Sequence, residues 1–446
     1  MIGAISSRQA LALVLALFAL IRPVCADTLP EVLGKALARH PGVRSGEALR
    51  SASDEQLNQV RSNYYPILGI DMISQDASDQ DFGISRDRST RRADAFLRWN
   101  LFRGLGDREG ERTAEFNSLA ARADLDAAGE QAALQITLAY LDVLRLRSIL
   151  ALDNDFQVEL KRLDGDMAKR FQVGRIPQVD KEQSRASLIQ ASARQAQLQG
   201  QLRGAEIRFR LLVGYAPGVL SEVTLDDAAA QLDQDALLEG LLAGNDRLRG
   251  SRQRSAARGA EVGVAESAFY PRLELEVRRR LHNDVDPVPQ TQTQDMTQFQ
   301  LNYQIPLGGS TFSRKREAIA RRQAAEAALD EETLRAQSEI TQLWSAWREA
   351  RNIAPQLAER AIASVSVVKA YDLQFEAGRR SLNELIGARN EQYRVRVDAL
   401  ENRMEQISTN ARVLALLGRL RASLLGDRSP RPAPHPVSTH VRPEKR

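Results

Sequence analysis

The chain lacks most of what enzymes and helical membrane proteins depend on. Its 446 residues include one cysteine, Cys25, and four histidines. It contains no nucleophile elbow, phosphate-binding glycine loop or cluster of metal-ligand residues. Beyond the first 26 residues, no run approaches 18 consecutive apolar residues, so no segment is expected to cross a bilayer as a helix. We therefore expect neither catalysis nor a cofactor, and any membrane span would consist of β-strands.

Aromatic residues are also scarce, at 5% of the chain, whereas Ala, Leu, Gln, Arg and Glu dominate long stretches. This composition favours extended helices over a thick globular core. The formal net charge is +4, and no block of basic residues alternates with aromatics, so no nucleic-acid partner is expected. Residues 427–446 are rich in Pro, Arg and His and are predicted to form a disordered tail.

Residues 1–26 have the pattern of a secretory signal peptide. Arg8 precedes an apolar run over residues 10–21, and small residues lead to a cleavage point after Ala26. Cleavage there would leave an exported chain without cysteine, which excludes disulfides. Lipidation of Cys25 is the alternative, but the residues before it match a lipoprotein signal poorly.

The remaining chain reads as two copies of one unit. "SNYYPILGIDM" at residues 62–72 matches "SAFYPRLELEV" at residues 267–277, and "KRFQVGR" at 169–175 matches "LQFEAGR" at 373–379. Gly378 follows Gly174 by 204 residues, and the other landmarks keep this spacing within one residue. A repeat of this length is the sequence signature of a duplicated structural unit.

Each copy is expected to contain a helix, a strand hairpin, a long helix, a glycine turn and a returning helix. The first copy spans residues 27–217, with a helix over 43–63, a hairpin over 65–102, a long helix over 107–171, a tip at 172–177 and a helix over 178–213. The second spans 218–426, with a helix over 235–268, a hairpin over 270–307, a long helix over 313–376, a tip at 377–380 and a helix over 381–425. Polar loops are expected at 76–92 and 283–294, between the strands of each hairpin.

The long helices are expected to pair as coiled coils. Residues 107–171 contain no proline and would extend roughly 98 Å as one helix. In the second long helix, apolar and small residues recur in alternating steps of three and four, which is the spacing of a narrow coiled-coil seam. The seam positions are Ile340, Leu343, Trp347, Ala350, Ala354, Leu357, Ala361, Ser364, Val368, Tyr371 and Phe375. Pro355 is expected to bend this helix locally.

The predicted strands alternate between one apolar and one polar face, and their length of about ten residues suits a membrane-spanning strand. The lipid-facing candidates are Leu97, Trp99, Phe299, Leu301 and Tyr303. The lumen-facing candidates are Arg272, Glu274, Gln300, Asn302 and Gln304. A half-buried sheet of a soluble protein would show the same alternation.

Four strands are too few to span a membrane alone. In a bilayer every backbone polar group needs a partner, so the sheet must close, and small barrels use about eight strands. Two chains would supply eight strands and three would supply twelve, and twelve can enclose a water-filled lumen.

The ordered set of hairpins, long helices and "FxxGR" turns resembles the TolC family of outer-membrane channels over almost the whole mature chain. The resemblance implies a mainly α fold with membrane β-strands. In this fold, four strands per chain form a twelve-stranded barrel in a homotrimer, and a long antiparallel coiled-coil barrel continues it into the periplasm. It also implies a passive exit duct that docks on a periplasmic membrane-fusion adaptor and an inner-membrane pump.

The resemblance further assigns roles near the glycine turns. The adaptor-docking tips would be Gly174 and Arg175 in the first copy and Gly378 and Arg379 in the second. A periplasmic gate would use Asp180, Phe375, Arg380 and Glu384, with an Asp180–Arg380 link, Phe375 in place of the family's tyrosine, and Glu384 in an acidic ring. Gly387 occupies a second position of that ring and carries no charge.

Two cargo classes remain open within this interpretation. Type I protein secretion would use an ABC transporter, and small-molecule efflux would use a proton-driven pump. The absence of a lipoprotein-like signal at Cys25 favours secretion. A non-transporting, soluble periplasmic coiled-coil scaffold is the alternative of another class.

Overall fold

A computed structural model gives the structure of the chain and describes residues 27–81, 84–225, 227, 233–286, 295–304 and 307–426. The predicted signal peptide and C-terminal tail therefore lie outside the described residues. The helices are α2 Leu29–Leu37, α3 Pro41–Arg61, α4 Gly106–Gln172, α5 Gln178–Val213, α7 Gln234–Gly244, α8 Asp246–Glu266, α9 Ser310–Glu376, α10 Leu382–Leu416 and α11 Leu420–Leu425, with short 3-10 turns η1 Ser62–Tyr64 and η2 Ser267–Phe269. The strands are β1 Ile67–Asp81, β2 Ile84–Arg103, β3 Arg272–Asp286 and β4 Asp295–Asn302.

The two halves of the chain contain the same order of elements. A helix of 21 residues and a 3-10 turn lead into a strand pair in each half, as α3 and η1 or as α8 and η2. A helix of 67 residues follows in each half, α4 or α9. The returning helices α5 and α10 have 36 and 35 residues.

The structure divides into two compact units, which we call the sheet unit and the tip unit. The sheet unit comprises Gly42–Ala128 and Gly244–Ser338, and the tip unit comprises the described parts of Met1–Pro41, Gly129–Ala243 and Glu339–Arg446. The long helices α4 and α9 each contribute one segment to either unit.

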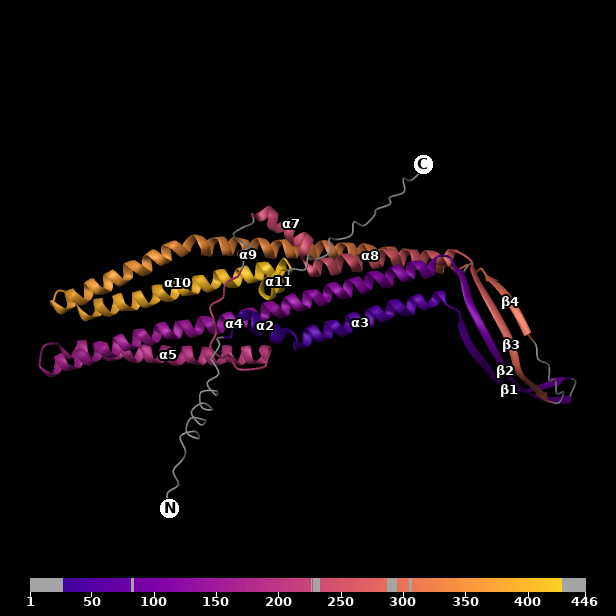
Figure 1. The fold of residues 1–446 in the computed structure, drawn as a ribbon, viewed down its shortest axis with the longest axis horizontal. Helices are drawn as coiled ribbons and strands as arrows, with labels where there is room; N and C mark the ends of the chain where they lie inside the picture. The colour runs from indigo at the N-terminus through magenta and orange to yellow at the C-terminus, as the bar shows by residue number, and fades with distance from the viewer. Residues whose placement is uncertain are drawn as a thin grey trace, which may run out of the picture. The chain divides into compact units, whose positions relative to one another are not determined.

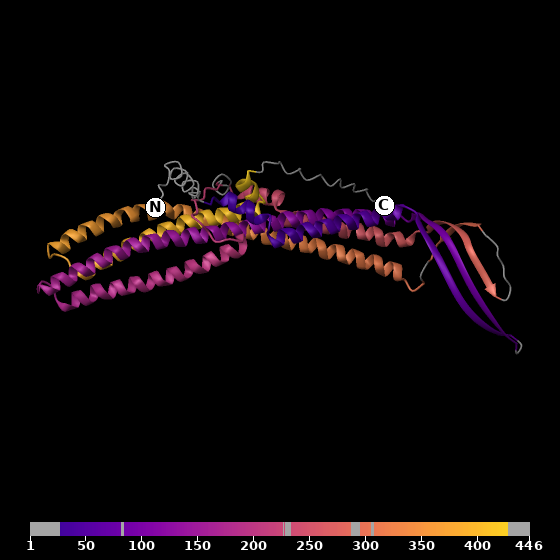
Figure 2. The same cartoon turned by 60° about the horizontal axis from the view of Figure 1, so that its bottom comes forward.

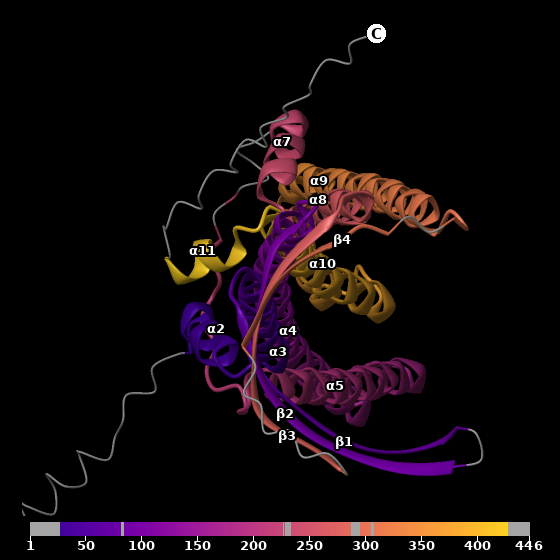
Figure 3. The same ribbon diagram turned by 90° about the vertical axis from the view of Figure 1, so that its right-hand side faces the viewer.

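The sheet unit contains all four strands in one antiparallel sheet with the order β1-β2-β3-β4 (Figure 3). Ion pairs connect its helices near the ends from which the strands leave (Figure 1). Arg61 of α3 contacts Glu111 of α4 at 2.8 Å, and Lys315 of α9 contacts Glu266 of α8 at 3.0 Å. The strands therefore start from, and return to, a base of paired helices.

Strands β1, β2 and β3 are longer than the sequence predicted, and β4 is shorter, at eight residues. The expected loop at 76–92 is wrong, because the ladder between β1 and β2 continues to the pair Asp81–Ile84. The expected loop at 283–294 is wrong in its first four residues, because β3 continues to Asp286. Extended polar residues can pair as well as apolar ones, because the ladder uses backbone groups. Strand β4 ends at Asn302, so Tyr303 and Gln304 lie beyond it, and residues 287–294, 305 and 306 lie outside the described residues.

The tip unit contains two helical hairpins, in which α5 returns beside α4 and α10 returns beside α9 (Figures 1 and 2). An apolar cluster from α4, α5 and α10 includes Phe156, Met167, Leu382 and Leu385. Within it the buried Asp153 carboxylate receives a hydrogen bond of 2.8 Å from Arg194, whose guanidinium carbon lies 4.1 Å from the centre of the Tyr393 ring. The ion pair thereby joins α4 to α5, and the contact of Arg194 with Tyr393 joins both to α10 of the second half.

The seam predicted along α9 is confirmed by burial. Ile340, Trp347, Ala350 and Val368 are buried, and the other seven seam positions are half-buried. Helix α9 continues through Pro355 without a break. A narrow stripe of small and apolar residues is therefore enough to pack this helix.

Two predicted helices are each broken in the structure. The expected helix over 235–268 is α7 and α8, because Asn245 stops the first and caps the second by accepting a hydrogen bond of 2.9 Å from the Leu248 amide. The expected helix over 381–425 is α10 and α11, because Gly418 adopts a φ of 65° at the end of α10. In the part of the chain that the structure describes, no helix is long and apolar enough to cross a membrane.

A buried tyrosine in the tip unit ties Asp27 to the connection between the two halves. The Tyr140 hydroxyl is 2.8 Å from the carbonyl oxygens of both Asp27 and Ser221, and the side chain is fully buried. Tyr215 packs against the same core, but its buried hydroxyl has no partner among the described residues.

We expect Tyr140→Phe to lower the free energy of unfolding by about 1–3 kcal/mol, since it removes a buried donor that the two carbonyl oxygens share. Tyr215→Phe is the matched control and should be neutral or stabilising, because it removes an unpartnered hydroxyl. Denaturation of the purified protein would measure both. Equal losses from the two substitutions would contradict the role given to the Tyr140 hydroxyl.

Candidate functional site

One face of the sheet is apolar and exposed. Register places Trp99 beside Leu275 and Leu275 beside Phe299, so these side chains share a face, and Leu97 and Leu301 lie on it too. Exposed fractions of 41% for Trp99, 69% for Phe299 and 66% for Leu301 are high for large apolar side chains. Nothing in the described chain covers this face, which therefore requires an apolar environment or a partner.

β-Bulges interrupt the alternation that the sequence suggested. The register shifts between Asn100 and Phe102, so Leu101 has no partner on β3 and Phe102 pairs with Leu273. A second shift lies between Ala93 and Asp94. A bulge adds one residue to a strand and moves the following side chains to the opposite face. Simple alternation therefore fails at these two points.

The opposite face is polar and carries the lumen-facing candidates that lie within strands. Glu274 is in register with Asn100 and Gln300, and Arg272 with Arg103 and Asn302. The Gln300 amide donates to the Asn302 side-chain oxygen at 3.2 Å. Further along the strands, the same face carries a network of arginines and carboxylates around Asp94.

A phenylalanine lies in the middle of this polar face. The guanidinium carbons of Arg98 and Arg278 lie 5.0 and 5.5 Å from the centre of the Phe96 ring. The ring also covers Gly69 on β1, where a Cβ atom would lie 2.4 Å from Phe96 Cζ. Phe96 was missed by the sequence analysis, although a glycine paired with an aromatic residue across two strands is a recognisable signal.

Both outer edges of the sheet lack a neighbouring strand. Among the described residues, β1 pairs only with β2, and β4 pairs only with β3. An unpaired edge presents a row of backbone donors and acceptors that can bind another strand. The sheet can therefore be extended on either side by further strands.

The two glycine turns at the helical tips have the same geometry. Gly174 and Gly378 have φ values of 71° and 68°. The Arg175 amide bonds the Arg170 carbonyl at 2.9 Å, and the Arg379 amide bonds the Gln374 carbonyl at 2.8 Å. These are Schellman turns, which need a residue with positive φ. They leave the side chains of Arg175 and Arg379 exposed at the ends of the hairpins.

The tip unit brings two of the four gate candidates together. Arg380 forms an ion pair with Glu384 and donates a hydrogen bond of 3.0 Å to Gln374. The Phe375 ring instead contacts Arg170 of α4, whose guanidinium carbon lies 5.4 Å from the ring centre. Among the described residues, no ion pair links Arg380 to Asp180, which is half-buried on α5. The expected Asp180–Arg380 link is thus not formed within one copy of the chain.

Two residues near this cluster were missed by the sequence analysis. The Arg380 guanidinium lies over the Tyr371 ring, 4.6 Å from its centre, so a tyrosine does belong to the cluster one turn before Phe375. Arg389 of α10 contacts Asp372 of α9 at 2.7 Å and Glu159 of α4 at 3.7 Å. The signal for Tyr371 was its position on the same seam as Phe375.

The Glu384 carboxylate is held in its ionised form. It accepts a hydrogen bond of 3.0 Å from the Ser381 backbone amide, and the Ser381 side chain accepts one from the Glu384 amide, which makes a capping box at the start of α10. The amide, followed by Arg380 and the Ser381 hydroxyl, lowers the pKa of Glu384 to about 2. Glu384 therefore keeps its charge throughout the neutral range.

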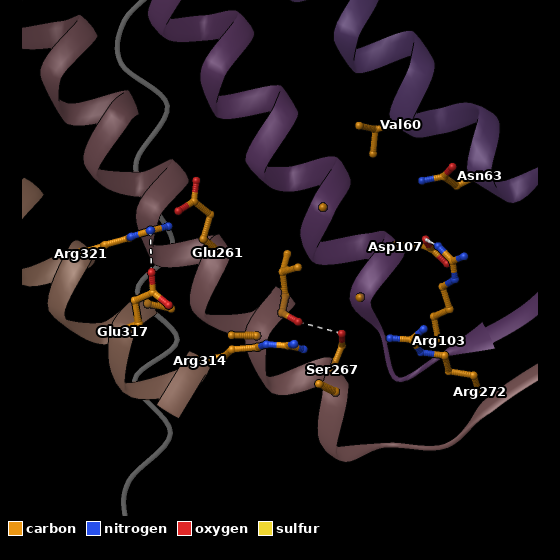
Figure 4. Close-up of a pocket in the computed structure, with 16 residues that line it drawn as sticks. Val60, Asn63, Arg103, Asp107, Glu261, Ser267, Arg272, Arg314, Glu317 and Arg321 are labelled. Carbon is orange, nitrogen blue, oxygen red and sulfur yellow. Dashed lines mark hydrogen bonds and ion pairs between the residues drawn. The ribbon is translucent and has the colours of Figure 1, made fainter. Parts of the chain in front are cut away.

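A recess of about 670 Å³ lies in the sheet unit where the strands meet the helices (Figure 4). Arg103 and Asp107 contact each other at 3.5 Å on one side, and Arg321 and Glu317 at 2.6 Å on the other. Arg272, one of the lumen-facing candidates, lies beside Arg103 (Figure 4). In the described residues, no group of His, Cys, Asp and Glu could hold a metal ion.

Comparison with known proteins identifies the family. A model of outer membrane efflux proteins matches residues 32–215 and 237–419, which together are most of the chain. The chain belongs to the outer membrane efflux protein family. A curated relative, the outer membrane efflux protein BepC of Brucella suis, is 23% identical over 406 residues, covering 90% of this chain and 87% of BepC.

Solved structures support the same fold. The Campylobacter jejuni CmeC outer membrane channel has a TM-score of 0.76 at 15% identity, covering 88% of this chain and 86% of CmeC. The open state of the Neisseria gonorrhoeae MtrE outer membrane channel has a TM-score of 0.73 at 16% identity, covering 88% of this chain and 89% of MtrE. The expected TolC-like fold is confirmed.

We expect Glu384→Gln to lower thermal stability by an amount that becomes smaller in acid. Because folding lowers the pKa of this carboxyl from 4.5 to about 2, its stabilising contribution is complete above pH 4.5 and is lost as the pH falls through about 2. The difference in melting temperature between wild type and variant should be constant from pH 8 to 5 and shrink below pH 4.5. Glu376→Gln, at an exposed carboxylate with no ion pair among the described residues, is the control. A difference that grows in acid would refute the assignment.

Proposed function

We propose that the protein is an outer-membrane exit duct that works as a homotrimer. Three copies supply twelve strands, which close into one barrel with the apolar face toward lipid and the polar face toward water. The long helices continue this barrel into the periplasm. The duct is passive and needs no cofactor, since the partner pump supplies the energy.

The observation that carries this proposal is the four-stranded sheet with two open edges and an exposed apolar face. Lipid can cover the apolar face, but it cannot bond the edges, because unpaired backbone groups cost several kcal/mol each in a bilayer. Strands of other copies satisfy both edges. Trimers are preferred to dimers because eight strands leave an interior filled by side chains, whereas twelve can enclose water.

The helix lengths fit a duct that crosses the periplasm. Helices α4 and α9 have 67 residues each, which corresponds to about 100 Å. The exposed tips at Gly174, Arg175, Gly378 and Arg379 are proposed to dock on a membrane-fusion adaptor. A proton-driven pump or an ABC transporter in the inner membrane completes the assembly.

The cargo that we propose is small molecules, because the matching family and BepC are both described as efflux proteins. Type I protein secretion is a second candidate. It is favoured by the residues before Cys25, which do not resemble a lipoprotein signal. Acylation of Cys25, detected by mass spectrometry of the mature protein, would remove that argument.

The trimer and the membrane location can be tested together. We expect the protein in outer-membrane fractions, with a detergent-corrected mass of three chains and steady ion conductance in planar bilayers. A monomer found only in the soluble periplasmic fraction would refute the duct and favour the coiled-coil scaffold.

For the gate, we propose that Arg380 holds the tips closed through Glu384, Tyr371 and Asp180 of a neighbouring copy. Arg380→Ser should therefore raise single-channel conductance several-fold, since it removes the guanidinium group that binds all three partners. Arg379→Ser, at an exposed neighbouring arginine, should leave conductance unchanged when no adaptor is present.

The link to Asp180 has a separate test. If Asp180 of one copy meets Arg380 of the next, the double substitution with serine should raise conductance no more than the larger single effect. Additive effects would exclude a direct link, and no effect of Arg380→Ser would exclude the proposed gate.

A further inference from the structure

The polar face of the sheet carries four arginines and three carboxylates in one connected network. Arg92, Arg278 and Arg280 lie 3.0, 3.3 and 3.4 Å from the Asp94 carboxylate. The remaining members of the network are Arg98, Glu276 and Asp71. Arg98 and Arg278 contact Glu276 at 3.0 and 2.8 Å, and Arg278 contacts Asp71 at 3.0 Å.

The two signs of charge are not equally exposed in this network. The side chains of Asp94 and Glu276 are 2% and 15% exposed, whereas those of Arg92 and Arg98 are 34% and 45% exposed. Two of the three carboxylates thus lie beneath guanidinium groups, and only Asp71 is open to solvent, at 44%. A solute at this face meets mainly the outer N–H groups of arginine.

The surroundings do not cancel this bias. Strand β4 adds only neutral side chains to the same face, from Met296, Gln298, Gln300 and Asn302. Toward the helices, Arg103, Arg272 and Glu274 lie on the same face, and Arg103 pairs with Asp107 of α4 at 3.5 Å, so the charges there balance. The network keeps an excess of one positive charge per chain.

We propose that this face is an arginine-lined band that selects anionic solutes. The inference rests on the proposed function, in which the face lines a water-filled pore. Rings of arginine favour anions in pores, because the fixed charge lowers the energy of an anion in the lumen. Guanidinium groups also suit phosphate, sulfate and carboxylate oxygens, which they bind in a bidentate manner. The anionic groups of a cargo are the chemistry that this band recognises.

Tripolyphosphate block of the full-length protein in planar bilayers tests the proposal. The variant Arg92→Gln/Arg98→Gln removes the two exposed guanidinium groups, while Arg278 and Arg280 still pair with the buried carboxylates. We expect tripolyphosphate to block wild-type current, and the half-blocking concentration to rise about tenfold in this variant. The chloride-to-potassium permeability ratio should be lower in this variant than in wild type.

Three variants act as controls. Arg279→Gln removes an arginine of β3 that lies next to Arg278 but on the apolar side, where it pairs with Asp295, and it should leave the block unchanged. Arg92→Lys/Arg98→Lys keeps the charge and should retain most of the block. Asp71→Asn removes the exposed carboxylate and should strengthen it.

The outcomes separate this inference from the proposed function. If wild type and all variants fail to conduct, the duct itself is refuted. If they conduct, but tripolyphosphate blocks wild type and the glutamine variant equally, the arginine band is refuted. If the glutamine variant fails to assemble, the other two variants decide. The proposal is overturned if Asp71→Asn leaves the block unchanged and the lysine variant loses it.

Discussion

Backbone hydrogen bonding at the edges of the sheet is the constraint on which the rest of the structure depends. Four strands satisfy one another in the interior of the sheet but leave β1 and β4 each with an open side. In water those edges could be solvated, but the exposed apolar face makes water an unfavourable environment for the sheet. An apolar surrounding removes that cost and at the same time forbids open edges. Only additional strands meet both requirements, so the assembly that we propose follows from the sheet of a single chain.

The sequence was most informative where one interaction repeats over many residues. The seam of α9 could be predicted because eleven positions obey one spacing, and local exceptions such as Pro355 do not disturb it. The polar and apolar faces around Trp99 and Phe299 could be predicted for the same reason, since side chains alternate along a strand. In both cases a single residue contributes little, and the pattern survives because the backbone geometry is regular.

Features that depend on one residue or one contact could not be predicted from a repeating sequence pattern. Alternation cannot reveal the bulge at Leu101, because the register shift depends on how β2 meets β3, about 170 residues later in the chain. The break at Asn245 comes from one side chain that caps α8 better than it continues α7. At the tip, Arg380 was assigned to a distant carboxylate, but Glu384 lies one helical turn away and reaches it first. A local partner at i+4 usually wins over a remote one, because its position is already fixed by the helix.

In both the sheet and the tips, carboxylates are bound by arginine side chains. In the sheet, Asp94 is nearly enclosed by three arginines, and at the tips Glu384 is bound by Arg380 and by the start of α10. Strands β2 and β3 carry arginine, none of the four strands carries lysine, and this difference has a physical consequence. A guanidinium group can bond a carboxylate on one side and still present N–H groups on the other, whereas an ammonium group is a compact point charge. Arginine therefore lets one set of side chains stabilise a buried carboxylate and face the solvent with positive charge, so that the stability of the sheet and the selectivity proposed for the pore depend on the same residues.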